Sequence, residues 1–129
     1  MHATKRIEIR WRDLEGFAHV NNSTYLTYLE EARDEFFTGL LGETVHRVVI
    51  RHIEIDFRSG LVHTDDHVDV EVELESVGTS SATTIERIRS VADGRIAAEA
   101  RSVVVHTDAG RAVSEPWPDD SRRALEALL

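Results

Sequence analysis

Cysteine is absent from this chain of 129 residues, which excludes disulfides, thiolate nucleophiles and Cys-ligated zinc or iron–sulfur centres. No apolar run approaches the roughly 20 residues that a membrane-spanning helix needs. The first residues, MHATKRIEIRWRD, also lack the apolar core of a secretory signal. We therefore expect a cytoplasmic protein with no membrane partner.

Positive charge is scarce as well, with 15 Lys and Arg residues against 24 Asp and Glu, a formal net charge of −9. Because nucleic-acid binding depends on clustered cations, no nucleic-acid partner is expected. The sequence has no Gly-rich phosphate loop and no Gly-x-Ser-x-Gly elbow, which argues against nucleotide hydrolysis and serine-triad chemistry. No pair of histidines has metal-binding spacing on a predicted helix, so we expect no metal site and no cofactor.

Hydrophobic residues make up 41% of the chain and charged residues 30%, which is typical of a globular protein of one domain, here residues 1–129. The longest helical pattern covers residues 22–40. Its apolar residues recur at spacings of three and four: Tyr25, Leu29, Ala32, Phe36 and Leu40, with Tyr28 and Phe37 widening the stripe. Asn21, Asn22 and Ser23 are candidate N-caps, and Gly39 and Gly42 mark the end of the helix.

Five segments have the alternation or the β-branched composition of strands. They are residues 5–12, 45–57, 67–77, 81–91 and 95–107. Short glycine-containing turns at Gly78 and Gly94 predict that the last three strands form an antiparallel meander. In the tail, Leu125 and Leu128 could dock a short amphipathic helix within residues 119–129.

The order of these elements predicts an α+β fold in which one helix covers a sheet face. A single helix cannot cover five strands, so we expect a second copy of the chain to bury the remaining surface. A homodimer or a dimer of dimers is therefore predicted.

Residues 13–33 read DLEGFAHVNNSTYLTYLEEAR and bring acid, imidazole and amide side chains to the junction between a strand and the long helix. The unpaired N–H groups of a helix's first turn stabilise negative charge that develops on an oxygen. A nearby carboxylate could activate water or attack a carbonyl carbon directly. The segment is therefore the predicted centre of the chemistry.

This segment resembles the signature of the 4-hydroxybenzoyl-CoA thioesterase-like branch of the hotdog superfamily, D-x-D-x-x-G-H-V-N-N-x-x-Y-x-x-Y-x-E-x-x-R. The residues that match it are Asp13, His19, Val20, Asn21, Asn22, Tyr25, Tyr28, Glu30 and Arg33. Two positions depart from it, with Glu15 at the second Asp and Ala18 at the Gly. The resemblance implies a hotdog fold: a curved five-stranded antiparallel sheet wrapped around one long central helix, with a short C-terminal helix.

The resemblance also implies a metal-independent acyl-CoA thioesterase, acting on an aliphatic or aromatic acyl group, with active sites at the interface of a dimer. It places the catalytic carboxylate at Glu15, while His19 orients or polarises the substrate and the Asn22 N–H contributes to the oxyanion site. Asp13 is a further catalytic candidate. The candidates for substrate binding are Tyr25, Arg33 and, for the phosphates of coenzyme A, Arg58, Arg87 and Arg89.

Each of these residues also has a purely structural interpretation. Asp13 could cap a turn or pair with Arg33, and Glu15 could be a solvated loop acid. His19 could be a hydrogen-bonding loop residue, and Asn21 and Asn22 could be N-caps. The two tyrosines, Tyr25 and Tyr28, could belong to the core, and Arg33 could form a surface pair with Glu30 or reach across a dimer.

We expect an acyl-CoA substrate rather than an acyl carrier protein, because acidic carrier proteins would be repelled by a chain with a net charge of −9. Two other functions remain open from the sequence. One is a non-catalytic hotdog module that binds acyl thioesters, and the other is hydration of an enoyl thioester.

Overall fold

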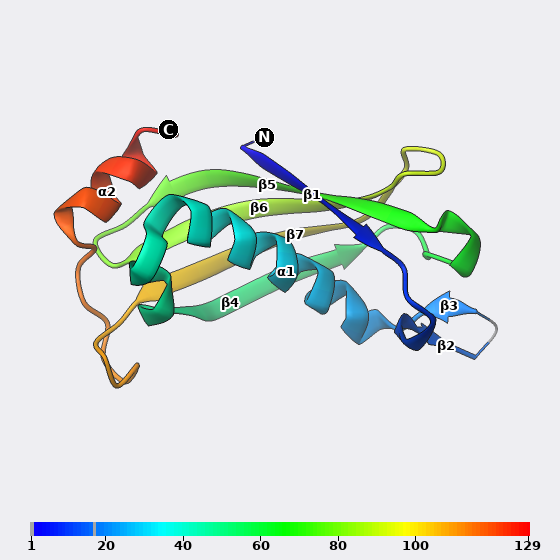
Figure 1. The fold of residues 1–129 in the computed structure, drawn as a ribbon, viewed down its shortest axis with the longest axis horizontal. Coiled ribbons are helices and arrows are strands. Elements are labelled where there is room, and N and C mark those ends of the chain that lie inside the picture. The colour runs from blue at the N-terminus through cyan, green and yellow to red at the C-terminus, as the bar shows by residue number, and fades with distance from the viewer. Residues whose placement is uncertain (1, 17) are drawn as a thin grey trace.

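The computed structural model describes residues 2–16 and 18–129, and its centre is a five-stranded antiparallel sheet that curves around one long helix (Figure 1). The strands in spatial order are β1 (Ala3–Glu8), β5 (His67–Val77), β6 (Ser81–Ser90), β7 (Ile96–His106) and β4 (Val48–Phe57). The long helix α1 (Asn22–Leu41) lies across one face of this sheet. This arrangement confirms the predicted α+β hotdog fold.

The predicted meander of β5, β6 and β7 is also confirmed, with antiparallel pairing between β5 and β6 and between β6 and β7. The first turn is closed by a hydrogen bond from the Gly78 N–H to the Ser81 carbonyl oxygen at 2.8 Å. In the second turn Gly94 has a φ of 77°, in the left-handed region that residues with a Cβ atom rarely adopt. The two glycines thus fix where the chain reverses.

Helix α1 begins and ends close to the predicted positions. The Asn21 side chain caps it by accepting a hydrogen bond from the Ser23 N–H at 2.9 Å. The helix ends at Leu41 because Gly42 turns to a φ of 57°. Along its buried stripe lie Tyr25, Tyr28, Leu29, Ala32, Arg33, Phe37 and Leu41. Two residues predicted for this stripe, Phe36 and Leu40, are only half-buried.

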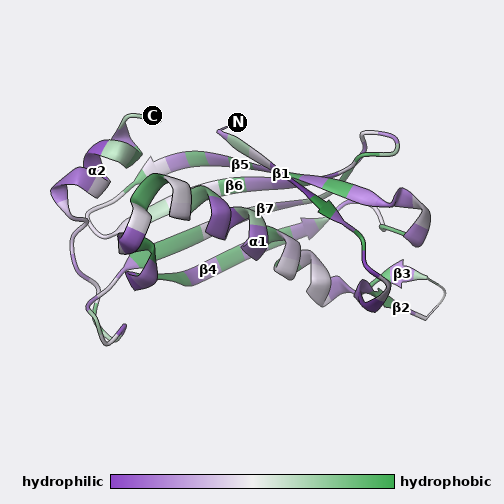
Figure 2. Ribbon diagram, in the orientation of Figure 1, coloured by the Kyte–Doolittle hydropathy of each residue, from purple (hydrophilic) through white to green (hydrophobic). Residues whose placement is uncertain are grey.

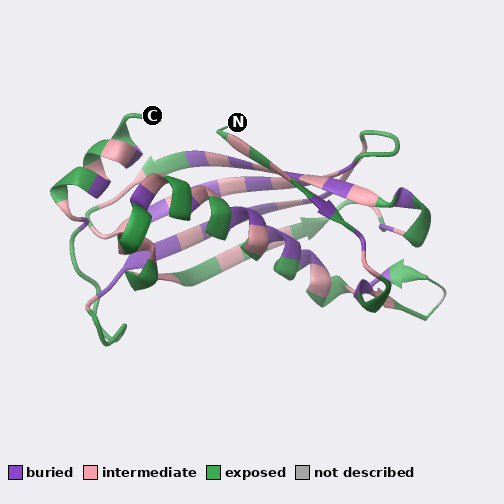
Figure 3. Cartoon of the chain, viewed as in Figure 1, coloured by how far each residue is buried: buried purple, intermediate pink, exposed green. Residues whose placement is uncertain are grey.

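The core lies between α1 and the inward face of the sheet. Polar and apolar residues alternate along the strands (Figure 2), and buried residues alternate with half-buried ones along β5 and β6 (Figure 3). One apolar cluster surrounds Tyr28 and Leu29, and a second surrounds Phe37 and Leu125 near the end of α1. The alternation of apolar and polar residues in β5 and β6 therefore corresponds to alternating burial of their side chains, as predicted.

The first predicted strand, 5–12, is wrong at its end. Strand β1 stops at Glu8, the last residue paired with β5, and Trp11–Asp13 forms a single turn of 3₁₀ helix. The Asp13 carboxylate accepts a hydrogen bond from the Arg10 N–H at 2.9 Å, which stabilises this turn in place of a continued strand. As a result the Trp11 side chain is 83% exposed, although the alternation placed it on the buried face.

Two further boundaries differ from the prediction. The second long strand, β4, starts at Val48 rather than at residue 45, because Gly42–Arg47 forms a 3₁₀ helix. A short ribbon of two strands, β2 (Leu14–Glu15) and β3 (His19–Val20), was not predicted at all. Strands of two residues are too short for a period to be recognised.

The predicted C-terminal helix is confirmed as α2 (Asp119–Glu126), which packs against the end of α1 through the fully buried Leu125. Just before it, the Trp117 side chain is buried and its Nε1–H donates to the Ser81 carbonyl oxygen at 2.9 Å. Within the described ranges, no helix combines the length and the apolar character needed to cross a membrane.

Candidate active site

The ribbon β2–β3 stands immediately before the amino end of α1, at one end of the molecule (Figure 1). Its antiparallel register places Glu15 directly opposite His19. Both side chains are exposed. The structure thus brings together, at the start of the long helix, the carboxylate and the imidazole that the sequence singled out.

Asn21 connects the ribbon to the helix. Its Oδ1 atom accepts the hydrogen bond that caps α1, and its Nδ2–H donates to Glu15 Oε2 at 3.1 Å. An amide side chain can do both because it carries a donor and an acceptor. The sequence predicted Asn21 only as a cap, so its second contact, which orients the Glu15 carboxylate, was missed.

Asn22 is the first residue of α1, as predicted, and it is exposed. The next two N–H groups of the helix are used, since Ser23 donates to the Asn21 side chain and Thr24 donates to the Asn21 carbonyl oxygen. Among the described residues, none accepts a hydrogen bond from the Asn22 N–H. A helix N–H that is open to solvent beside a carboxylate can bind the oxygen of a polarised carbonyl.

Asp13 occupies a different environment from Glu15, because it is buried and surrounded by donors. Its Oδ2 atom accepts hydrogen bonds from the Tyr28 hydroxyl at 2.7 Å, the Arg10 N–H at 2.9 Å and the Arg10 Nε–H at 3.3 Å. Burial acts to raise the pKa of Asp13, but these hydrogen bonds outweigh it and hold the pKa below 3.8. The predicted role as a turn cap is confirmed, and the predicted pairing with Arg33 is wrong, since Arg10 is the partner.

The two tyrosines are buried, which confirms their interpretation as core residues. Tyr28 donates to Asp13, and its pKa is raised by burial and by that carboxylate. The Tyr25 hydroxyl accepts a hydrogen bond from the Leu61 N–H at 2.9 Å, and its ring meets Phe57 edge-on at 5.2 Å between centroids. Tyr25 thus ties the first turn of α1 to the segment that follows β4.

Arg33 is buried at 5% exposure and forms an ion pair with the fully buried Glu86 of β6, with 2.9 Å between Nη1 and Oε1. Ser102 Oγ donates to the same carboxylate oxygen at 3.0 Å. The predicted surface pair of Arg33 with Glu30 is therefore wrong. Glu86 was missed, although a charged residue at an inward position of an alternating strand is a signal that the sequence offers.

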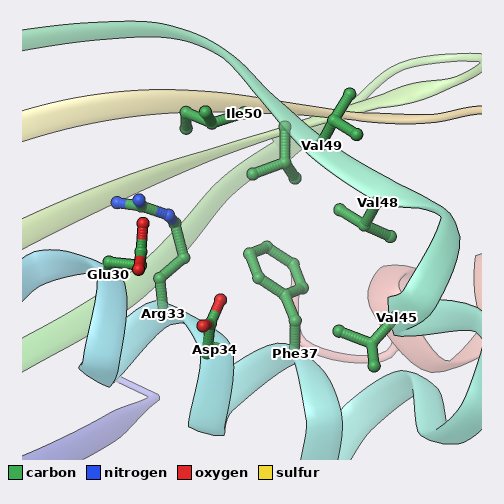
Figure 4. Close-up of a pocket in the computed structure, with 9 residues that line it drawn as sticks. Glu30, Arg33, Asp34, Phe37, Val45, Val48, Val49 and Ile50 are labelled. Carbon is green, nitrogen blue, oxygen red and sulfur yellow. The ribbon is translucent and has the colours of Figure 1, made fainter. Parts of the chain in front are cut away.

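Arg33 also lines a cavity of about 200 Å³ between α1 and β4 (Figure 4). Phe37, Val48 and Val49 form apolar walls, and the acidic side chains of Glu30 and Asp34 stand on the helix side. Arg33 lies eleven positions beyond Asn22 on the same helix, a rise of about 16 Å. Within one chain, the cavity and the Glu15 carboxylate are therefore separate places.

The arginines considered for phosphate binding have acidic neighbours. Arg58 follows β4, is about half exposed, and lies 3.8 Å from Glu99 and 3.9 Å from Asp56. Arg87 and Arg89 project from β6 toward acidic residues of β5, at 3.8 Å from Glu73 and 3.4 Å from Glu71 respectively. Of the three, Arg58 has the most exposed side chain. Elsewhere, in the part of the chain that the structure describes, no three His, Asp or Glu side chains are grouped so that they could hold a metal ion.

Comparison with known proteins shows the family to which the chain is similar. A family model described as the thioesterase-like superfamily matches residues 9–125. The chain is 25% identical to the long-chain acyl-CoA thioesterase FadM of Escherichia coli (strain K12) over 130 residues, which cover 96% of this chain and 97% of that protein.

Two solved structures are similar throughout. A thioesterase from Thermus thermophilus, complexed with coenzyme A and Zn, superposes with a TM-score of 0.86 at 29% identity, over 97% of this chain and 92% of that chain. A predicted thioesterase from Bacillus stearothermophilus superposes with a TM-score of 0.86 at 30% identity, over 98% of this chain and 95% of that chain.

Proposed function

Because the chain belongs to the thioesterase-like superfamily, we propose that this thioester hydrolase cleaves acyl-CoA to a free acid and the coenzyme A thiol, with Glu15 as the catalytic carboxylate. The observation that carries the proposal is the position of Glu15, held by Asn21 beside the open amino end of α1. The similarity to an acyl-CoA thioesterase of Escherichia coli and to a thioesterase bound to coenzyme A supports this choice of substrate.

In the proposed reaction, Glu15 takes a proton from a water molecule whose oxygen attacks the thioester carbonyl carbon. The tetrahedral intermediate then collapses, the C–S bond breaks, and the proton passes to the departing sulfur. Glu15 could alternatively attack the carbonyl carbon itself, so that the C–S bond breaks, the coenzyme A thiolate leaves and takes a proton from solvent, and an anhydride remains. Water then hydrolyses this anhydride to the free acid and the Glu15 carboxylate. In both routes an exposed carboxylate is needed, and Glu15 rather than the buried Asp13, whose Oδ2 atom accepts three hydrogen bonds, satisfies this need.

The Asn22 N–H is the proposed donor to the thioester oxygen, on which negative charge develops during attack. The helix macrodipole strengthens such a donor, and loss of one donor of this kind typically reduces turnover by about 10²–10³. His19, opposite Glu15 in the ribbon, is proposed to polarise or orient the same carbonyl group. Asp13 is proposed to support this arrangement, since its carbonyl oxygen accepts a hydrogen bond from the Asn21 N–H at 2.9 Å.

Arg58 is the proposed contact for a phosphate of coenzyme A, because it is exposed and lies three residues before residues 61–63, which hydrogen-bond to the ribbon. We also propose Tyr25 and Arg33 as walls of the substrate site, but only in a dimer whose second chain completes that site. The net charge of −9 continues to favour coenzyme A over an acidic carrier protein. The cytoplasmic location stays a prediction.

A second copy of the chain is proposed to complete the site. Strand β4 is an edge of the sheet, and it exposes Ile50 at 45% and Phe57 at 50%. Edge strands of ten residues with apolar side chains are rarely left open in soluble proteins. Pairing of two β4 edges would cover them, and we expect sedimentation equilibrium to give a homodimer, or a dimer of dimers, that Ile50→Lys disrupts.

The proposed activity is tested by offering purified protein a panel of aliphatic and aromatic acyl-CoAs and following the free thiol. We expect Glu15→Gln to lower kcat by at least about 100-fold, because general-base catalysis contributes about 10²–10⁴. Glu43→Gln, at a fully exposed acid far from the ribbon in sequence, is the matched control and should retain full activity. No hydrolysis of any chain length, or full turnover in Glu15→Gln, would contradict the proposal.

A further inference from the structure

Asp65 has a hydrogen-bond environment that the proposed chemistry does not use. It is 5% exposed, at the end of the short 3₁₀ helix His63–Asp65. The Arg95 guanidinium binds it with two parallel hydrogen bonds of 2.9 Å, one to each carboxylate oxygen. Ser90 Oγ and the Val62 N–H donate to it as well, each at 2.8 Å. The pKa of Asp65 is lowered to about 2, first by Arg95, so the pair is ionised at neutral pH.

The Asp65–Arg95 ion pair joins the 3₁₀ helix His63–Asp65 to the turn between β6 and β7. Ser90 is fully buried at the end of β6, and Arg95 immediately precedes β7. From there Arg95 reaches across to the segment after β4, where its Nη2–H also donates to the Gly60 carbonyl oxygen at 2.7 Å. Bidentate arginine–carboxylate contacts fix orientation as well as distance. Residues 60–65 are therefore anchored at both ends by one guanidinium.

The anchored segment lies directly against the ribbon that carries Glu15 and His19. The Val20 N–H donates to the Leu61 carbonyl oxygen at 2.9 Å, and the His63 N–H donates to the Ala18 carbonyl oxygen at 3.1 Å. His19 and Val62 form an antiparallel bridge between these hydrogen bonds. Residues 61–63 thus act as a third strand beside β3.

The ribbon needs such support because it is too short to be stable alone. It contains only two paired positions, and isolated two-stranded hairpins are marginally stable even when they are longer. It is also held by Asn21, whose N–H donates to the Asp13 carbonyl oxygen and whose side chain donates to Glu15. The side of the ribbon that carries His19 is held by residues 61–63.

We propose that the Asp65–Arg95 ion pair positions the catalytic ribbon, by holding residues 60–63 against His19 and Val20. The proposal rests on the proposed function for its kinetic consequence. Asp65 and Arg95 touch no reacting atom in this scheme; they are positioning residues. Catalysis is sensitive to displacements near 1 Å, so loosening the ribbon lowers turnover more than it lowers substrate binding.

The test compares Arg95→Met with Arg6→Met, because Arg6 binds Asp69 in the same bidentate manner at 2.9 and 3.0 Å, between β1 and β5 and away from the ribbon. For Arg95→Met we expect kcat to fall at least about tenfold while KM stays within about threefold. Arg6→Met should leave both values unchanged. Arg95→Lys keeps the charge but not the paired hydrogen bonds, so its kcat should lie between those of Arg95→Met and the unsubstituted protein.

Hydrogen exchange provides a readout that does not depend on activity. In Arg95→Met the amide of Val20 should exchange at least about tenfold faster, while amides in the middle of β6 stay protected. If Arg95→Met does not fold, Ser90→Ala removes one contact of the same carboxylate, and a smaller acceleration at Val20 is expected. Unchanged kcat in an otherwise active protein, unchanged Val20 exchange, or equal acceleration throughout the sheet would each overturn the proposal.

The two proposals fail separately in these experiments. If the unsubstituted protein hydrolyses no acyl-CoA, the proposed function is wrong, and Val20 exchange still decides whether the ion pair holds the ribbon. If the unsubstituted protein is active and Arg95→Met retains its kcat, the positioning role is wrong and the function stands.

Discussion

Removal of one partner of the buried Arg33–Glu86 ion pair should destabilise the protein far more than removal of both. Arg33 is 5% exposed and Glu86 is fully buried, with 2.9 Å between the charged groups. At an effective dielectric constant of about 20, their attraction is about 6 kcal/mol, opposed by several kcal/mol of desolvation for each ion. The attraction between the two ions and the cost of removing them from water are therefore of similar size.

The single substitutions Arg33→Met and Glu86→Met each leave an unpaired charge in the core. We expect each to lower the free energy of unfolding by about 3–5 kcal/mol, a large fraction of the roughly 5–15 kcal/mol typical of a domain. Neither Glu86 Oε2 nor Thr84 Oγ1 has a hydrogen-bond partner within the described ranges, so the pair is imperfectly satisfied. The double substitution should therefore be neutral or stabilising by about 1–4 kcal/mol.

The pH dependence of the unfolding free energy provides an independent test of this reasoning. Burial raises the pKa of Glu86 above 4.5, while Arg33 and Ser102 oppose the rise. Without Arg33 the pKa rises further, and a carboxyl group whose pKa is raised by folding contributes stability at low pH that is lost as the pH increases. The cost of Arg33→Met should therefore be largest at neutral pH and should shrink as the pH falls toward 4.5 and Glu86 becomes protonated in the folded state.

Urea unfolding at several pH values, followed by circular dichroism, measures these differences for the four proteins of the double-mutant cycle. Lys5→Met is the matched control, because Lys5 forms an exposed ion pair with Glu35 at 2.8 Å and its loss should change the unfolding free energy little. Single effects that simply add in the double variant, or an Arg33→Met cost that is the same at pH 7 and pH 5, would refute the reasoning.

Two further predictions concern the long helix. Gly39→Ala, at an exposed helical position where an added methyl group would have no other atom within 4 Å, should stabilise the protein by about 0.5–1 kcal/mol in urea unfolding. Gly42→Ala should instead destabilise it by about 1–3 kcal/mol, because φ is 57° at Gly42. Equal effects of the two substitutions would contradict the assignment of Gly42 as the end of the helix. Tyr28→Phe removes a 2.7 Å donor from the buried Asp13 carboxylate and should cost about 1.5–3 kcal/mol at pH 7. Because folding lowers the pKa of Asp13, the Tyr28→Phe difference should shrink as the pH falls below 3.8, and a difference that grows in acid would count against this network.

Much of the fold could be predicted because its signals are local. Strand β5 has the predicted bounds, and β6 and β7 differ from prediction by one residue at most at each end, since alternation over ten residues is a strong pattern. Helix α1 was predicted to within one residue from its apolar period and its asparagine cap. One error occurred where a side chain ended an element, since the Asp13 carboxylate stabilises a turn after β1. The others concern a 3₁₀ helix before β4 and a ribbon too short for its period to be recognised.

The candidate site was partly predictable for the same reason. Glu15, His19 and Asn22 lie within eight residues, so they are near neighbours along the chain. The ribbon that sets their geometry was not predicted, because it depends on hydrogen bonds to residues 61–63, more than 40 positions away. Their functional roles stay predictions.

By itself, the sequence determined an α+β order of one long helix and five strands, because hydrophobic periodicity, capping and short turns act between near neighbours. The resemblance to the hotdog signature implied the hotdog architecture and the choice of Glu15 as the catalytic carboxylate. Only the tertiary structure decided which charged side chains are buried together. Arg33 pairs with Glu86 over 53 residues of sequence, Asp65 with Arg95 over 30, and the Tyr25 hydroxyl meets the Leu61 N–H over 36. These pairings depend on the curvature and register of the sheet, because these determine which side chains of distant strands and loops face each other.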